Sequence, residues 1–172
     1  MSDFYFEVII FIIAYVIPLY VANASPIILH GKMPIDFNKN INGKRILGKG
    51  KTILGSLSGV FCGSIAGFIF AFFYPNIFLV IPNYLLLAVL LSFGAILGDI
   101  VESFFKRRFG FQSGQRCVIF DQIDFILGGL ILSFFVIIPR IEVILIILFA
   151  TIFIHSITNV IAFKLGLKKV PW

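Results

Sequence analysis

Charged residues are scarce in this chain. Lys, Arg, Asp and Glu make up 13% of the 172 residues, hydrophobic residues make up 60%, and the mean hydropathy is +1.09. A soluble domain is about half apolar and about a quarter charged. The shortage of charge therefore excludes an ordinary soluble domain and a disordered chain, and it predicts an integral membrane protein. Since a spanning helix needs about 20 residues, the length fits five spans and no separate soluble domain.

Cysteine is scarce too. Cys62 falls inside an apolar run and Cys117 in a basic loop, so we expect neither a disulfide framework nor a metal site built from cysteines. A P-loop is also missing. Gly50-Lys51-Thr52 resembles the end of one, but Arg45 stands where the motif needs glycine, and no strand precedes it. The first apolar run lacks a basic segment before it and is too long for the core of a signal peptide, so we expect it to be a span.

Long apolar runs predict an all-α bundle of five transmembrane helices. The predicted spans are residues 4–24, 53–74, 84–105, 122–138 and 141–163. The loops 30–52 and 106–121 and the C-terminal tail hold six, four and three of the 14 Lys and Arg residues, which leaves only Arg140 on the other side. By the positive-inside rule, the N-terminus lies outside and the C-terminus in the cytoplasm. We therefore expect a single domain, residues 1–172, in the cell membrane with its site facing the cytoplasm.

Glycine recurs every fourth residue in the second predicted span, at Gly55, Gly59, Gly63 and Gly67. Such a stripe of small residues lets another helix approach closely. It predicts tight helix packing, and it is also the surface through which we would expect a homodimer to form.

The densest group of charges lies between Gly98 and Phe125. Half of the eight acidic residues are here, at the ends of long apolar runs. Two acids lie three residues apart on one predicted helix and two lie three residues apart on the next, so each pair shares a helix face. Because the connecting loop is short, the two acidic faces should meet near one membrane surface. The charged residues of this cluster are Asp99, Glu102, Asp121 and Asp124, with Lys106, Arg107, Arg108 and Arg116.

Carboxylates beside Lys and Arg suit a magnesium–polyphosphate ligand. Mg²⁺ takes one or two protein carboxylates and completes its shell with phosphate oxygens and water, while Arg and Lys hold the remaining phosphate charge. The alternative is internal salt bridging beside a positively charged cytoplasmic loop. Charge at the end of a membrane-length apolar run is costly and favours a functional site. Because the cluster has no histidine and no paired nucleophile and base, attack by an already anionic lipid phosphate on a nucleotide fits best.

The same residues carry a resemblance to a known family. The run from Asp99 through Glu102 and Lys106 to Arg108, followed by Asp121-Gln-Ile-Asp124, resembles the signature of the membrane CTP-transferases, which include phosphatidate cytidylyltransferase. The loop segments 34–39 and 43–52 are more similar to the archaeal branch, the CDP-archaeol synthases. The resemblance implies that CTP and 2,3-bis-O-geranylgeranylglycerol 1-phosphate give a CDP-lipid and pyrophosphate, with Mg²⁺. The loop departs from the branch at Asn42 and Lys49, where we expect acidic residues.

The resemblance also implies roles for individual residues. Asp99, Asp121 and Asp124 would be catalytic and would hold the metal. Asn159 is a further candidate because it lies near the basic end of the last span, whereas Asn23 either ends the first helix or contributes to the site. The residues implied to bind substrate, some of them as weaker candidates, are Lys106, Arg107, Arg108, Ser103, Lys44, Arg45, Lys51 and Thr52.

Other functions use similar residues. An ester-lipid phosphatidate cytidylyltransferase is one alternative, and a small transporter or channel for an ion or phosphate compound is another. The sequence shows no inverted repeat, and its charges lie at one membrane face and not at the midplane, where transporter sites usually lie. The basic residues lie in loops beside spans, which favours phosphates and lipid headgroups as partners over nucleic acid.

The charge asymmetry makes the topology testable. With Cys62 and Cys117 replaced by serine, Lys169→Cys should be protected from a membrane-impermeant thiol reagent added outside the cell, because the segments rich in Lys and Arg stay in the cytoplasm. Arg140→Cys lies on the opposite side and should be labelled. Labelling of Lys169→Cys in intact cells would overturn the predicted orientation.

Overall fold

Six helices and one short β-hairpin make up the part of the chain that the structure, a computed structural model, describes: residues 2–113, 115, 117, 120–167 and 170. Arg116, Lys168 and Lys169 lie outside these described residues. The helices are α1 (Ser2–Ile28), α2 (Ile53–Phe73), α3 (Ile77–Val80), α4 (Tyr84–Arg108), α5 (Phe120–Ser133) and α6 (Ile141–Lys164).

Four helices, α1, α2, α4 and α6, are long and apolar enough to cross a membrane. They correspond to four of the five predicted spans. The predicted helix over residues 122–138 is wrong beyond Ser133, because α5 has 14 residues and is about 21 Å long at 1.5 Å per residue. The amides of Val136 and Ile137 both donate to the Ser133 carbonyl, each at 2.8 Å, which turns the chain. Pro139 further disfavours a helical residue before it.

The loop before α2 contains a β-hairpin that an all-α prediction leaves out. Strand β1 (Asn40–Ile41) pairs antiparallel with β2 (Lys44–Arg45). Between them Asn42 and Gly43 have positive φ angles of 51° and 74°, which is the conformation of a two-residue type I′ turn and the reason that Asn-Gly is favoured there. Asn42, one of the two departures from the expected loop pattern, is thus a turn residue.

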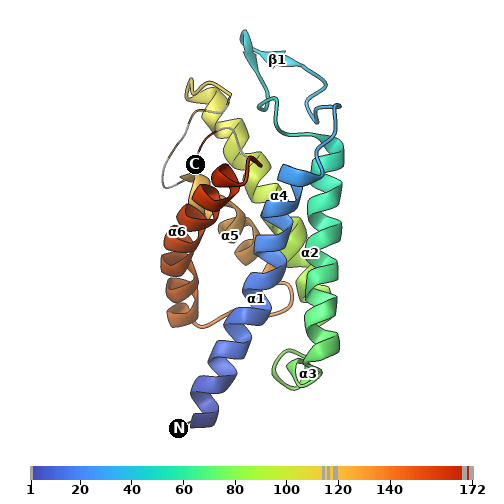
Figure 1. Cartoon of the computed structure of the whole chain (residues 1–172), viewed down its shortest axis with the longest axis vertical. Helices are drawn as coiled ribbons and strands as arrows, with labels where there is room; N and C mark the ends of the chain where they lie inside the picture. The colour runs from blue at the N-terminus through green and yellow to red at the C-terminus, as the bar shows by residue number, and fades with distance from the viewer. Residues whose placement is uncertain (1, 114, 116, 118–119, 168–169, 171–172) are drawn as a thin grey trace.

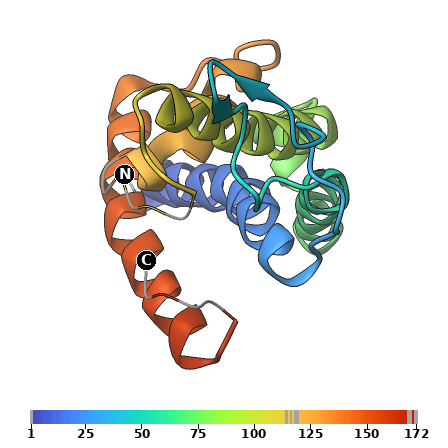
Figure 2. The same cartoon turned by 90° about the horizontal axis from the view of Figure 1, so that it is seen from above.

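Helices α1, α2 and α4 pack together, α5 lies against α4, and α6 runs along one side of the bundle (Figures 1 and 2). The start of α1 lies at the bottom of Figure 1, and the hairpin that contains β1 lies at the top. The core between the helices holds Tyr15, Leu19, Tyr84 and Phe125. The buried Tyr15 hydroxyl donates to Ser133 Oγ at 2.8 Å, so an otherwise costly polar group also ties α1 to the end of α5.

The glycine stripe of α2 faces into the bundle. Gly55, Gly59, Gly63 and Gly67 are all buried. A Cβ added at Gly63 would lie 2.5 Å from Ser92 Oγ on α4 and 2.7 Å from the Pro18 carbonyl oxygen on α1. The predicted close packing is confirmed, and its partners are helices of the same chain.

A second glycine contact joins α4 to α5. A Cβ at Gly98 would overlap the carbonyl oxygen of Asp124 and lie 2.9 Å from its carbonyl carbon. A Cβ at Gly94 would lie 2.6 Å from the Gly129 Cα. The two backbones therefore touch beside Asp99 and Asp124, and this contact places the carboxylates of different helices next to each other.

This contact predicts that Gly98→Ala destabilises the protein. An alanine in a helix is normally about 1 kcal/mol better than glycine, but here the methyl group forces α5 away from α4, and overpacking of this kind costs about 1–3 kcal/mol. We expect a lower unfolding temperature in detergent, measured by circular dichroism. Gly50→Ala is the control, because its Cβ would meet nothing within 4 Å. Equal unfolding temperatures for Gly98→Ala and the wild type would contradict the contact.

Candidate active site

A cavity of about 1110 Å³ lies among α1, α4, α5, α6 and the loop that leads into α2. Ligand pockets typically have volumes of about 300–1,000 Å³, so this cavity has room for a large ligand or for two. Its lining combines charged and polar residues with apolar residues of α1 and α6. Most of the residues predicted to form a site line this cavity.

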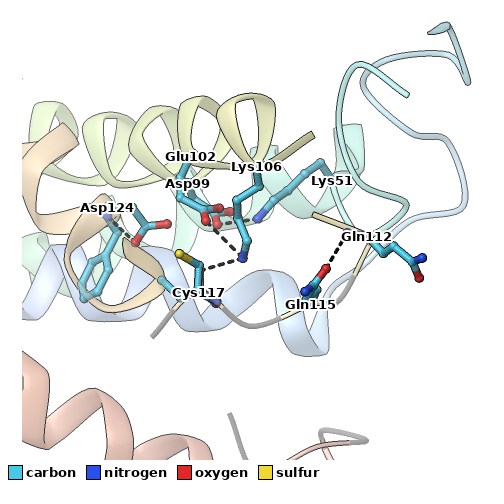
Figure 3. Close-up of polar contacts among 10 residues, drawn as sticks. Lys51, Asp99, Glu102, Lys106, Gln112, Gln115, Cys117 and Asp124 are labelled. Carbon is cyan, nitrogen blue, oxygen red and sulfur yellow. Dashed lines mark hydrogen bonds and ion pairs between the residues drawn. The ribbon is translucent and has the colours of Figure 1, made fainter. Parts of the chain in front are cut away.

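Three carboxylates gather in the cavity, and we call Asp99, Glu102 and Asp124 the carboxylate triad (Figure 3). One oxygen from each lies within 4.8 Å of the others. Asp99 and Glu102 are three residues apart on α4 and share a face, and Asp124 comes from α5. Like charges this close repel one another unless a cation lies among them. The triad offers only hard oxygen donors, which suit Mg²⁺ and fit the predicted cofactor.

Two lysines neutralise part of this charge. The Lys51 ammonium pairs with Asp99, and the Lys106 ammonium lies 3.1 Å from Glu102 Oε1 and 2.7 Å from Asp121 Oδ1. Glu102 Oε1 forms this ion pair but accepts no hydrogen bond of good geometry from the described residues. Asp121, predicted from the sequence to hold the metal, is not one of the three triad acids and lies beside them, where it shares Lys106 with Glu102.

Asp121 also organises the chain before it. Its Oδ2 accepts a hydrogen bond from the Cys117 amide at 3.1 Å. Together with the Lys106 contact, this bond ties the end of α4 to the start of α5. Asp121 thus positions Lys106 and the short connection, while Asp124 faces Asp99.

Arg107 is a buried cation without a carboxylate partner among the described residues. Its side chain lines the cavity, the residue is only 7% exposed, and its Nε and Nη1 atoms donate to no partner. A buried guanidinium group without a partner is costly. Its donors are therefore available to an anion in the cavity.

Four further predicted residues line the cavity: Asn23, Thr52, Ser103 and Asn159. Asn23 lies inside α1, which continues to Ile28, so it does not end that helix. The Thr52 hydroxyl caps α2 by accepting from the Gly55 amide at 3.2 Å, so part of its hydrogen-bonding capacity is used by the fold. Ser103 and Asn159 are buried.

Three predicted substrate-binding residues, Lys44, Arg45 and Arg108, are not among the residues that line the cavity. Arg45 forms an ion pair with Asp36 at 2.6 Å. Arg108 donates to the carbonyl oxygen of Arg45 at 2.5 Å and to that of Ile41 at 3.2 Å. The end of α4 is therefore fastened to the β-hairpin by Arg108, and these three residues shape the loop.

Two contributions were not predicted from the sequence. Glu102 was placed on the face of Asp99 by its spacing but was not assigned to the metal. Asp36 is the second: its carboxylate is fully buried and accepts from Arg45 and from the amides of Asn38 and Leu47. The pair Asn42-Gly43 is the sequence signal that would have predicted a hairpin and placed Arg45 on its second strand.

Comparisons with known proteins identify the family of the chain. A family model described as CarS-like, CDP-archaeol synthase, matches residues 5–172. The chain belongs to the CDP-archaeol synthase family. It is 42% identical over 166 residues to the CDP-archaeol synthase of Methanocaldococcus jannaschii, covering 92% of this chain and 94% of that protein. The corresponding protein of Pyrococcus horikoshii is 42% identical over 160 residues, with 92% and 94% covered.

A solved structure supports the same conclusion for the fold. It is described as an intramembrane enzyme for archaeal membrane lipids biosynthesis, and it matches with a TM-score of 0.78 at 33% identity, covering 86% of this chain and 92% of that one. Membership of the CDP-archaeol synthase family confirms the resemblance seen in the signature residues.

The loop contacts of Asp36 predict a pH-dependent fold of the hairpin. Burial raises the pKa of the Asp36 carboxyl, but the hydrogen bonds from Arg45 and from the Leu47 and Asn38 amides outweigh burial and bring the pKa below its usual value. A lowered pKa means that the carboxylate stabilises the loop fully above the unfolded value of about 3.9 and loses this effect as the pH falls through the folded value.

We therefore expect Asp36→Asn to lower the protection of the Leu47 and Asn38 amides from hydrogen exchange at pH 7, by roughly tenfold for a lost charged hydrogen bond. Lys39→Ala, on an exposed residue of the same loop, is the control. Below about pH 4 the wild type should approach the variant. Equal protection of both proteins at pH 7 would show that Asp36 does not hold the loop.

Proposed function

We propose that this chain joins CTP to 2,3-bis-O-geranylgeranylglycerol 1-phosphate, giving CDP-archaeol and pyrophosphate. Family membership makes it a CTP-dependent nucleotidyltransferase of membrane lipid biosynthesis. The observation that carries the proposal is one cavity that combines the carboxylate triad, the buried Arg107, whose Nε and Nη1 atoms have no partner among the described residues, and apolar lining residues. These are the groups needed to hold two phosphate substrates, one of them a lipid.

The reaction is a direct displacement at the α-phosphorus of CTP. An anionic oxygen of the lipid phosphate forms the new P–O bond, and the bond from the α-phosphorus to the bridging oxygen breaks, so that pyrophosphate leaves with the electron pair. The nucleophile needs no base to remove a proton. The protein's task is to position two anions and to stabilise the charge that moves onto the pyrophosphate.

Asp99, Glu102 and Asp124 are the residues that would hold Mg²⁺, since their oxygens converge in the cavity. When bound, Mg²⁺ would neutralise phosphate charge and orient the triphosphate. Asp121 acts beside them by holding Lys106 in place. Lys51, Lys106 and Arg107 supply the positive charge on the cavity wall that binds phosphate oxygens.

The hydrocarbon chains of the lipid should lie against the apolar part of the cavity. This part is formed by side chains of α1 and of the C-terminal half of α6, where many apolar residues are exposed. A lipid phosphate can then lie at the depth of Asn23 and Asn159 with its chains still in the bilayer. Among the apolar lining residues, Val21, Ala24, Ile27 and Ile28 lie on α1, Val160 and Ala162 lie on α6, and Leu167 and Val170 follow α6.

We further propose five membrane crossings with the cavity facing the cytoplasm. The end of α4 and the second half of α6 line the same cavity, so both lie at the same membrane face. If α4 and α6 each span the membrane, the residues between Arg108 and Ile141 must cross back. Helix α5 and the turn after it make this crossing, although α5 alone is short.

Formation of a homodimer remains a prediction. The glycine stripe of α2 is filled by Pro18, Ala22 and Ser92 of the same chain. A dimer would therefore have to form through another surface than the one the sequence indicated.

The proposed function predicts which lipid and which residues support CTP turnover. Purified protein with Mg²⁺ should release pyrophosphate with the geranylgeranyl ether lipid phosphate faster than with an ester phosphatidic acid, and EDTA should stop the reaction. Asp99→Asn, Glu102→Gln, Asp121→Asn and Asp124→Asn should each lower the rate by roughly a hundredfold or more, since lost metal or phosphate binding removes several kcal/mol of stabilisation.

Glu142→Gln is the matched control, because this exposed carboxylate lies in the first turn of α6, outside the cavity. It should turn over CTP at the wild-type rate. Rates near the wild type for two or more of the four cavity variants would mean that the carboxylates have a structural role. A faster reaction with the ester lipid would identify an ester-lipid cytidylyltransferase instead.

A further inference from the structure

The ion pair between Lys51 and Asp99 involves a member of the carboxylate triad. Asp99 is one of three acids whose oxygens lie within 4.8 Å of one another, and the Lys51 ammonium is bound to its Oδ1 atom. Lys51 comes from a different segment, the loop before α2, and both side chains line the cavity. A cation held by the triad and the Lys51 ammonium are therefore both attracted to the same carboxylate.

The backbone of Lys51 is fixed, so only its side chain can exchange partners. The Lys51 carbonyl accepts from the Ile35 amide at 2.9 Å, and its amide donates to the Gly48 carbonyl at 3.2 Å. The next residue, Thr52, caps α2 and pairs with Pro34 in an isolated β-bridge. The lysine side chain, by contrast, carries a compact ammonium group on a flexible four-carbon stem, so the ammonium can move while the backbone stays in place.

Lys51 and Lys106 differ in this respect. Lys106 contacts two carboxylates, Glu102 and Asp121, and Asp121 lies outside the triad, so Lys106 keeps a partner when a cation occupies the triad. Among the described residues, Asp99 is the one carboxylate that forms an ion pair with Lys51. At 22% exposure of its side chain, Lys51 is also close enough to the open cavity to reach a phosphate.

We propose that Lys51 is an exchangeable counter-ion that neutralises Asp99 and moves to the nucleotide phosphates when a divalent cation binds the triad. Lys51 and the cation then compete in the free protein and cooperate once CTP is bound. The second half of this proposal rests on the proposed function. Because binding linkage is reciprocal, the competition must appear in the cation affinity of the protein without nucleotide.

Two opposite effects follow for Lys51→Met. Without nucleotide, Mn²⁺ should bind about three- to tenfold more tightly than to the wild type, because one nearby positive charge is gone. With saturating Mg²⁺, CTP should bind at least severalfold more weakly, because a phosphate partner is lost. A lysine that merely supports the loop would weaken both. The first measurement is Mn²⁺ titration followed by electron paramagnetic resonance, and the second is calorimetry with CTP.

The controls separate this inference from the proposed function. Lys51→Arg keeps the charge and should leave Mn²⁺ affinity close to that of the wild type. Lys39→Met removes an exposed charge of the same loop, outside the cavity, and should change neither constant. Asp99→Asn should weaken Mn²⁺ binding in any case, since it removes a triad ligand. Lys51→Gln provides a second neutral variant should the methionine variant unfold at a lower temperature.

Three results would overturn the proposal. If Asp99→Asn weakens Mn²⁺ binding but Lys51→Met does not tighten it, the exchange is wrong and the metal site stands. If Lys51→Met tightens Mn²⁺ binding without weakening that of CTP, the lysine competes with the cation but does not move to phosphate, and the exchange is again wrong. If Asp99→Asn has no effect on Mn²⁺ binding, both the exchange and the proposed triad fail.

Discussion

At Gly98 the backbones of α4 and α5 touch, because Gly98 has no Cβ to overlap the carbonyl oxygen of Asp124. The remaining arrangement of charge depends on this contact. It places Asp124 of α5 against Asp99 and Glu102 of α4, although carboxylates repel one another. The packing of two apolar helices thus supplies the free energy that holds like charges together. The lysines then reduce the repulsion without removing the oxygen ligands from the cavity.

The cations of the site fall into groups with different roles, and burial and partners distinguish them. Lys106 bridges Glu102 and Asp121 and so joins the end of α4 to the start of α5. Arg108 donates to hairpin carbonyls and fixes the loop before α2 above the helix end. Arg107, between them in sequence, lines the cavity, and its buried Nε and Nη1 atoms donate to none of the described residues. Three consecutive basic residues on one helix therefore have different surroundings: the contact between α4 and α5, the cavity and the loop before α2.

The membrane explains why the site is built at one end of the bundle. Long apolar faces of α1, α2 and α6 remain exposed on the outside of the molecule, as a lipid environment requires. Burying a charged group in the hydrocarbon of the bilayer costs free energy, so charged groups lie where helix ends reach water, and a lipid phosphate lies at the same depth. A cavity lined by both charged and apolar residues is consequently suited to a water-soluble nucleotide and a lipid that stays in the bilayer.

The sequence by itself determined the class of protein, four of the spans, the packing stripe of α2 and the stretch that holds the site. These follow from local quantities: hydropathy over one helix length, small residues at a fixed spacing and charges at the ends of apolar runs. The turn at Asn42 and Gly43 is equally local, because its backbone conformation depends on those two residues, although the all-α prediction left it out. Family membership could be recognised for the same reason, since the signature residues are close in sequence.

Only the tertiary structure decided which charges meet. From sequence, Asp121 and Asp124 were equivalent metal ligands. In the structure Asp121 binds Lys106, whereas Asp124 joins Asp99 and Glu102 in the triad. Glu102 had not been assigned to the metal. Arg45 and Arg108 resembled substrate ligands, but they fasten the hairpin. The end of α5 at Ser133 was likewise hidden inside an apolar run. Side-chain partners depend on how two helices cross and on which rotamers fit between them, and neither is set by residues near each other in the chain.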